Sequence, residues 1–349
     1  MKRLPTLLTV LILLLILSPR ASAVEITPPE VPESGRSLMP NETATFGEGV
    51  LEILKTALPS IRPDLAEASK ICAGTMAVVL LLSLLQCLPG SNKNAIELAG
   101  AVAISCLLLA GTKSMLHLGA RTVNDISEYG KLLLPVMTAA LAAQGGVTTS
   151  AALYTCTAAF NAFLTALISK YLIPMIRIYL ALAVASGAIG ERALKQLQGL
   201  IKWSGTWCLK IILYAFTGFL SITGVVSGST DAAALKAAKL TISGMVPVVG
   251  SILSDASEAV LVSADLAKNA AGIYGILAIL AVFLMPFLQI GVHYLLLKLT
   301  AGICSIFGPK RITDLIHDLS SALGMLLAMT GSECILLLIS TVCFLRGVG

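Results

Sequence analysis

Residues 319–345 read LSSALGMLLAMTGSECILLLISTVCFL, an apolar stretch in which Glu333 is the only charged residue. A helix needs about 20 apolar residues to cross the hydrocarbon core of a bilayer, and this stretch is long enough. A shorter apolar stretch, 132–143, contains Pro135 and is either a short span or a re-entrant half-helix. Further spans are predicted at 71–89, 95–112, 150–169, 171–187, 204–226 and 270–292. The sequence therefore predicts an all-α, polytopic integral membrane protein with seven or eight transmembrane helices.

The composition supports the same class. Hydrophobic residues make up 56% of the 349 residues, charged residues make up 12%, and the mean hydropathy is +0.91. A soluble globular chain is about 45–50% apolar and about 25% charged. Polar side chains are too few to cover a water-facing surface, which makes a soluble enzyme unlikely on composition alone. No dense run of Lys and Arg indicates nucleic acid as a partner, so the expected partner is the lipid bilayer.

The N-terminus has the three parts of a secretory signal peptide, residues 1–23. Lys2 and Arg3 precede a short apolar core, and Ala21 and Ala23 supply the small residues of a cleavage site. The alternative is an uncleaved first transmembrane anchor. The apolar core is too short to span a bilayer, so we expect cleavage after Ala23 and a mature N-terminus on the outer side of the membrane.

Three regions follow the predicted signal peptide. Residues 24–45 are rich in proline and acidic residues and are expected to form a disordered extracytoplasmic linker. Residues 46–68 carry apolar side chains at three- and four-residue spacing, which predicts an amphipathic helix lying on a membrane or on a partner. Residues 69–349 are expected to form the polytopic helical membrane domain.

Polar interruptions separate the predicted spans. Residues 113–131 and 191–203 have amphipathic patterns, and 230–268 is the longest polar stretch. Within it, 242–253 is apolar but too short to cross and contains Pro247 and Gly250. These features predict interfacial helices and a re-entrant or interfacial hairpin. Irregular backbone at membrane depth needs cover from protein or a water-filled cavity. The candidate gating positions are therefore Pro135, Pro247 and Gly250. Glu333, the charge inside the last predicted span, is the candidate intramembrane polar position.

Motifs for chemistry are missing from the sequence. It contains no G-x-x-x-x-G-K-[ST], no H-E-x-x-H, and no C-x-x-C, and its three histidines are far apart. We therefore expect no catalytic, cofactor-binding or metal-binding residues, and no cofactor. Glu333 has two interpretations, because a charge at the bilayer centre costs at least about 2.5–3.5 kcal/mol. It either lines or couples a polar path, or it pairs with an Arg or Lys on a neighbouring helix or lies at a kink near the surface.

Several short segments resemble the stage III sporulation protein AE family, and the overall plan of signal peptide, acidic linker and polytopic body is also similar. The resemblance covers roughly residues 46–345. The segments are Leu132–Pro135, Gly145–Val147, Ala237–Lys239, Val246–Gly250, Ser254–Ala256 and Lys268–Gly272. The resemblance implies a mother-cell protein in the membrane around the forespore. It also implies a multi-protein, secretion-like channel complex whose other subunits and forespore partner meet across the intermembrane space.

Two main functions follow from these observations. The first is a non-enzymatic membrane subunit of that transenvelope complex, required for endospore formation. The second is an independent small-solute permease, because Pro- and Gly-broken helices build midplane sites in many transporters. Transporters commonly show internal repeats, and only a vague likeness links 125–146 to 231–250. An intramembrane hydrolase is the third interpretation, and the pairs of catalytic groups that it needs are missing.

Overall fold

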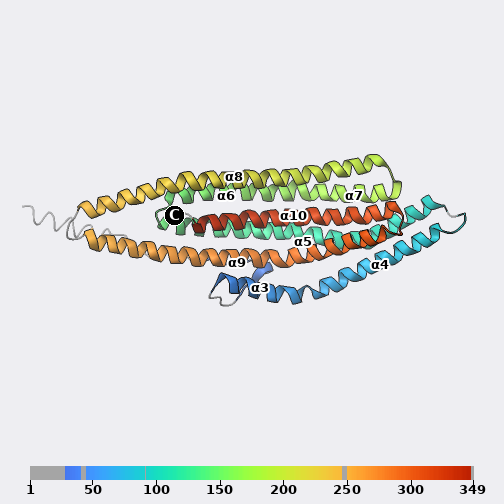
Figure 1. The fold of residues 1–349 in the computed structure, drawn as a ribbon, viewed down its shortest axis with the longest axis horizontal. Helices are drawn as coiled ribbons and strands as arrows, with labels where there is room; N and C mark the ends of the chain where they lie inside the picture. The colour runs from blue at the N-terminus through green and yellow to red at the C-terminus, as the bar shows by residue number, and fades with distance from the viewer. Residues whose placement is uncertain (1–27, 41–44, 91, 246–249, 347–349) are drawn as a thin grey trace, which may run out of the picture.

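The computed structural model describes residues 28–40, 45–90, 92–245 and 250–346, with backbone alone for 221–268 and 346. Two short helices precede long helices that lie side by side along one axis (Figure 1). The elements are α2 (Glu33–Arg36), α3 (Phe46–Ser60), α4 (Arg62–Gln86), α5 (Lys93–Ala143), α6 (Val147–Leu167), the π-helix η1 (Ile168–Leu172), α7 (Ile173–Ile189), α8 (Arg192–Met245), α9 (Gly250–Cys304) and α10 (Lys310–Arg346). No strand occurs in these ranges, as the sequence predicts.

Helix α10, which contains the apolar stretch 319–345, is the central element of the bundle. It contacts α5, α6, α7, α8 and α9. Figure 1 shows the turns α4–α5, α7–α8 and α9–α10 at one end of the bundle, here called the triple-turn end. The α5–α6 turn and the facing ends of α8 and α9 lie at the opposite end. The helix carrying Glu333 is therefore surrounded by protein.

The predicted count of seven or eight spans is not confirmed. Within the described residues, five helical stretches are long and apolar enough to cross a membrane: Arg62–Gln86, Lys93–Ala143, Val147–Ile189, Asn269–Cys304 and Lys310–Leu345. Segments predicted as separate spans join into single helices. Residues 95–112 and 132–143 both lie in α5, and 150–169 continues through η1 into 171–187. The predicted span 204–226 lies in α8 and extends past the described side chains.

These helices continue because their polar residues lie on faces away from the buried side and their prolines lie where a missing N–H donor can be accommodated. In 113–131 the apolar residues Leu116, Val123 and Ile126 are buried, so the polar residues occupy other faces and leave the helix intact. Pro174 lacks the N–H that an α-helix would bond to the carbonyl of Lys170. The wider turn of η1, directly before α7, accommodates that missing donor. A hydropathy window detects neither the buried apolar face of 113–131 nor the π-helix before Pro174.

The predicted amphipathic helix 46–68 is shorter than expected and packs on the chain itself. The side chain of Thr45 accepts a hydrogen bond from the N–H of Glu48 at 3.4 Å and caps α3, which ends at Ser60. Residues 62–68 instead begin α4. Ile53 and Ala57 are buried against α9. The apolar face of this helix therefore has an intramolecular partner.

Part of the predicted linker 24–45 is also packed. Residues 33–36 form α2, and Gly35 lies so close to Val282 of α9 that an added Cβ would be 2.7 Å from its side chain. Val31 and Leu38 are buried on either side of α2. The described part of the segment is thus ordered against α9, contrary to the expected disorder, because two apolar residues among the prolines give it a small buried face.

Three predictions lie outside the described residues or side chains. The signal peptide, with Ala21 and Ala23, precedes residue 28, and Pro247 falls in the gap 246–249. Gly250 is the first residue of α9, where only the backbone is described. The re-entrant hairpin predicted at 242–253 therefore stays a prediction.

Candidate functional site

Glu333 lies in the interior of the bundle, where α10 faces α6. Its side chain is fully buried, and its Oε1 accepts a hydrogen bond from Thr165 Oγ1 at 2.7 Å. Its other oxygen, Oε2, is buried with no hydrogen-bond partner. Among the described residues no Lys or Arg pairs with Glu333, and its hydrogen-bond partner is the Thr165 hydroxyl. The expected basic partner on a neighbouring helix is therefore not what holds this carboxyl group.

Further buried polar groups connect α6 to α5 next to this site. Asn161 lies one helical turn before Thr165, and its Nδ2 donates to Ser127 Oγ at 3.2 Å and to the Ser127 carbonyl at 3.4 Å. Asn161 Oδ1 and Thr157 Oγ1 are buried without partners. Gly130 allows α10 to pack closely on α5 beside this site, because an added Cβ would lie 3.0 Å from the Leu337 side chain. We call Ser127, Thr157, Asn161, Thr165 and Glu333 the buried polar site.

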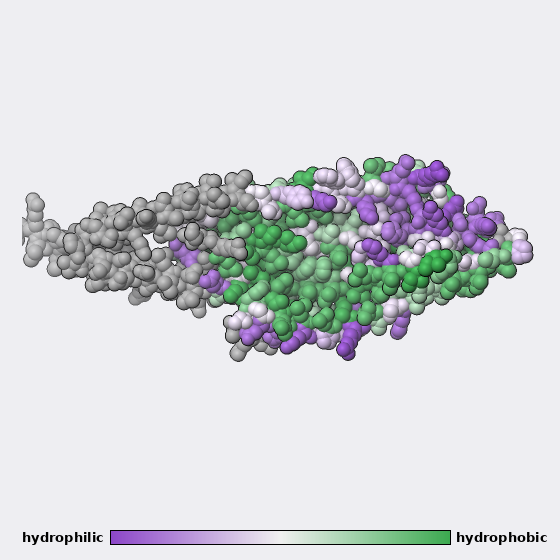
Figure 2. Space-filling view, in the orientation of Figure 1, coloured by the Kyte–Doolittle hydropathy of each residue, from purple (hydrophilic) through white to green (hydrophobic). Residues whose placement is uncertain are grey.

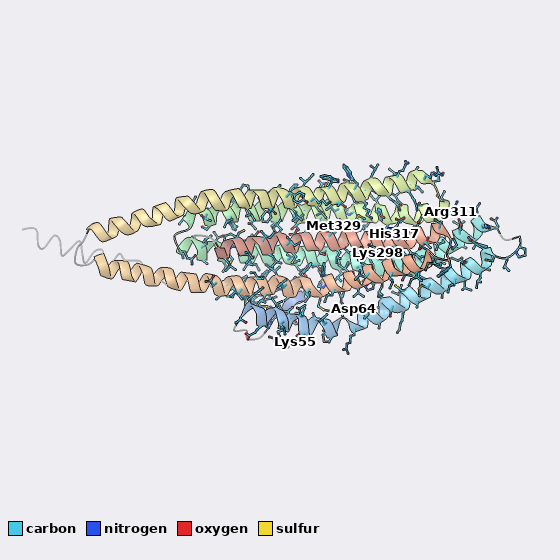
Figure 3. The ribbon with its side chains drawn as sticks, in the orientation of Figure 1. Lys55, Asp64, Lys298, Arg311, His317 and Met329 are labelled. Atoms are coloured by element: carbon cyan, nitrogen blue, oxygen red, sulfur yellow. The ribbon has the colours of Figure 1, made fainter. Side chains whose placement is uncertain are left out.

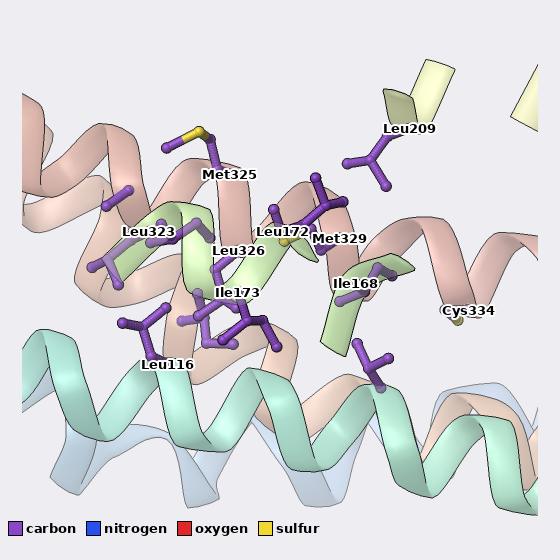
Figure 4. Close-up of a cluster of buried hydrophobic side chains, with 14 of the residues drawn as sticks. Leu116, Ile168, Leu172, Ile173, Leu209, Leu323, Met325, Leu326, Met329 and Cys334 are labelled. Carbon is purple, nitrogen blue, oxygen red and sulfur yellow. The ribbon is translucent and has the colours of Figure 1, made fainter. Parts of the chain in front are cut away.

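Apolar side chains close this site on the side of the triple-turn end. Figure 4 shows Leu116, Ile168, Leu172 and Leu326 packed together, with Cys334 at the edge of the cluster. Polar groups buried among such side chains cannot exchange their hydrogen bonds for water without opening the bundle. The buried polar site can therefore fix which faces of α5, α6 and α10 meet, or respond to a change in their packing.

Among the candidate gating positions, only the surroundings of Pro135 are described, and Pro135 does not join this site. Pro135 is exposed on α5, inside a continuous helix. Pro247 is outside the described residues, and the surroundings of Gly250 are not described. Of the four positions predicted together from the sequence, Glu333 alone can be placed in a polar environment.

A second polar cluster lies at the triple-turn end. Hydrophilic residues gather there, while apolar residues cover the middle of the bundle (Figure 2). Arg311 Nε lies 3.2 Å from Glu97 Oε2, and Lys195 pairs with Asp314. A cleft of about 530 Å³ runs between these pairs. Cross-helix ion pairs thus connect α5 with α10 and α8 with α10, and the predicted amphipathic segment 191–203 supplies one partner.

A charged stripe runs along the outside of α5, and the sequence analysis did not identify it. His117, Arg121, Asn124, Glu128 and Lys131 are all exposed. Their spacing of three and four residues places them on one face of the helix. We call these five residues the α5 polar stripe. The apolar pattern 116, 120, 123 and 126 is visible in the sequence, but only the observed exposure reveals the opposite face as a polar surface. Within the stripe, Asn124 Oδ1 accepts a hydrogen bond from Ser169 Oγ at 3.4 Å.

Metal and thiol chemistry find no support in the described part of the chain. No group of three or more His, Cys, Asp or Glu residues there could hold a metal ion. The eight cysteines are all free; Cys72, Cys156, Cys304 and Cys334 are buried, whereas Cys87 and Cys106 are exposed. The chemistry that this arrangement offers is hydrogen bonding and charge pairing between helices.

Comparison with known proteins identifies a sporulation family. A family model described as Stage III sporulation protein AE matches residues 43–347. Stage III sporulation protein AE of Bacillus subtilis (strain 168) is 23% identical over 207 residues, which is 59% of this chain and 52% of that protein. The matched region thus spans about half the length of the curated relative. No solved structure matches the chain.

Proposed function

The chain belongs to the stage III sporulation protein AE family, and on that premise we propose that it is a non-enzymatic membrane subunit of a secretion-like channel complex. The complex joins mother cell and forespore and is required for endospore formation. In this proposal the chain resides in the mother-cell-derived membrane around the forespore. Its partners are the other stage III subunits and a forespore protein that meets them across the intermembrane space.

The α5 polar stripe is the observation that carries this proposal. Charged side chains do not face acyl chains, because each costs about 2.5–3.5 kcal/mol or more at the bilayer centre. The stripe lies in the middle of a 51-residue helix that is one of the candidate spans. The stripe follows the apolar stretch 95–112 of this helix and is exposed in the single chain. Wherever α5 carries the stripe into the hydrocarbon core, its side chains need water or another protein against them. A subunit that assembles around an aqueous path meets that need.

Two further observations support a non-enzymatic role. The buried polar site contains one hydroxyl–carboxyl pair, Thr165 and Glu333, but no third group orients the carboxyl group as a base, because Glu333 Oε2 has no hydrogen-bond partner. Its groups are also enclosed by apolar side chains. Both features suit a helix-packing element better than a site that takes substrate.

Site-specific photo-crosslinking in sporulating cells tests the proposal. A photoreactive amino acid replaces Arg121 or Glu128 in the stripe, and a matched control replaces Phe163 or Ile178, which are exposed apolar residues. We expect adducts with other stage III proteins from the stripe positions and not from the controls. Equal yields from both sets, or none from the stripe, contradict the proposal.

Reconstitution separates the permease alternative. The purified full-length chain is placed alone in liposomes, and solute flux is measured against empty vesicles. An independent permease carries solute without other subunits, whereas the proposed subunit does not. Flux that depends on this chain alone would replace the channel-subunit proposal with the permease.

A further inference from the structure

A cationic cleft lies between α8, α9 and α10, separate from the buried polar site. Its volume is about 250 Å³. The polar residues that line it are Lys202, Thr206, Tyr294, Lys298, His317, Ser320 and Ser321. Figure 3 shows Lys298 and His317 near one another on neighbouring helices. Three helices thus bring two ammonium groups, an imidazole and four hydroxyls together around one small space.

The two lysines are held in place without a carboxylate. Lys202 Nζ donates to Ser321 Oγ at 3.3 Å. Lys298 Nζ donates to the Tyr294 hydroxyl at 2.9 Å and lies 5.2 Å from the centre of the same ring. Among the described residues, no Asp or Glu lines the cleft. The cleft therefore carries uncompensated positive charge.

The nearby carboxylates of α10 are occupied elsewhere. Asp314 pairs with Lys195, and Asp318 Oδ1 accepts a hydrogen bond from the Tyr179 hydroxyl at 3.3 Å. These contacts keep both acids directed toward α7 and α8 on the side of the triple-turn end. An anion that enters the cleft would meet ammonium, imidazole and hydroxyl donors and no competing carboxylate.

An apolar groove begins at the same lysine. Lys298 also lines a shallow groove on the outer face of α9, whose other residues are Leu295, Leu299, Gly302, Ile303 and Ile306. Leu295, Leu299 and Ile306 are exposed. A cationic cleft joined to an apolar groove matches a molecule with an anionic head and a hydrocarbon tail.

Two exposed tryptophans of α8, next in sequence to cleft residues Lys202 and Thr206, fit the same molecule. Trp203 follows Lys202 directly and is 61% exposed, and Trp207 stands one turn later with its ring centre 6.2 Å away. Tryptophan is enriched at the headgroup level of membranes, and basic pockets between membrane helices bind anionic headgroups. We propose that the cleft binds the phosphate group of an anionic phospholipid, with an acyl chain along the groove from Leu295 to Ile306.

Native mass spectrometry of the purified full-length protein in detergent tests this site. Phosphatidylglycerol and phosphatidylcholine with identical chains are titrated against the wild type and a Lys202→Gln/Lys298→Gln variant. Each lysine near a membrane surface contributes about fivefold in affinity for anionic lipid, so the double variant should bind phosphatidylglycerol about 25-fold more weakly. Its phosphatidylcholine binding should change little.

Matched variants keep the test independent of folding. Lys70→Gln/Lys210→Gln removes two exposed lysines outside the cleft and should bind like the wild type. Lys202→Arg/Lys298→Arg keeps the charge and should retain most of the preference. Circular dichroism confirms equal helix content in all variants. Equal binding of both lipids by the wild type, or equal loss in the Lys70→Gln/Lys210→Gln variant, overturns the proposal.

Inorganic phosphate distinguishes the two sources of the anion. If the tail contributes, millimolar phosphate displaces little phosphatidylglycerol. If phosphate displaces the lipid fully and itself remains bound only when both lysines are present, the cleft is a site for a free anion, and the assignment to a lipid is wrong.

Discussion

Replacing Thr165 by valine removes the hydroxyl that donates to Glu333 and keeps nearly the same side-chain shape. The Thr165 Oγ1–Glu333 Oε1 distance is 2.7 Å, and Glu333 Oε2 has no partner. Hydrogen bonds between membrane helices contribute about 0.6 kcal/mol on average and about 1.7 kcal/mol at most. Because Thr165→Val leaves a fully buried carboxyl group without its donor, we expect a loss at the upper end, about 1–2 kcal/mol.

A double-mutant cycle isolates that interaction. Glu333→Leu removes the carboxyl group, so Thr165→Val in that background loses only the contact between Thr165 Oγ1 and the Asn161 carbonyl, at 2.8 Å, and should cost less than about 0.5 kcal/mol. The coupling free energy should be about 1–2 kcal/mol. Thr155→Val is the control on the same helix. The Thr155 hydroxyl is exposed and donates only to the Ala151 carbonyl one turn earlier, at 2.9 Å, so its loss should change stability by less than about 0.5 kcal/mol.

Equilibrium unfolding of the purified protein in mixed micelles, followed by circular dichroism, measures these free energies. An equal cost of Thr165→Val in both backgrounds would refute the reasoning, because the hydroxyl would then act independently of Glu333. Sporulation frequency and protein abundance are measured in parallel for Glu333→Gln. A role beyond packing predicts impaired sporulation at normal abundance. Joint loss of both indicates a packing role, and normal sporulation removes the functional interpretation.

Three further predictions concern packing, processing and topology. Gly308→Ala should destabilise the protein by about 1–3 kcal/mol, because the added Cβ would lie 2.8 Å from the Cys304 carbonyl oxygen. The control Gly302→Ala has no atom within 4 Å of its Cβ and should be neutral or stabilising in the same unfolding assay. N-terminal sequencing of the mature protein should begin at Val24; a chain beginning at Met1 would show that the signal peptide is retained. In a chain without native cysteines, Lys236→Cys and Glu258→Cys should react with an impermeant thiol reagent from the same side of the membrane. Reaction from opposite sides would mean that 242–253 crosses.

The membrane class and the apolar segments could be predicted because hydropathy reports the average environment of a stretch. Hydropathy could not predict that neighbouring apolar segments join into single continuous helices. Residues 113–131 predict a separate interfacial helix between two spans, yet Leu116 and Val123 bury one face and the segment continues both spans as one helix. The sequence makes Pro135 a possible break, but the proline lies exposed inside the continuous helix α5, where the loss of hydrogen bonding stays local and is offset by neighbouring turns.

The partners of Glu333 show the second limit. Its position in an apolar stretch was evident, and a basic partner was one expectation. Its partner, Thr165, is 168 residues away and carries no charge, so no local pattern identifies it. Asn161 and Ser127 also pair across 34 residues, so no local pattern identifies their contact either. Which helix faces meet is decided by tertiary packing, and Gly130 contributes by leaving space that composition does not reveal.

The length of α5 sets the height of the molecule relative to its membrane. At 1.5 Å per residue its 51 residues extend about 77 Å, against a hydrocarbon core of about 30 Å. To fit within the core a straight α5 would have to tilt by about 67°, whereas membrane helices tilt by about 0–40°. Even at 40° it rises about 59 Å, so about 29 Å stands among headgroups or in water. A protein confined to the aqueous layer beside the bilayer can therefore bind this helix without entering the lipid.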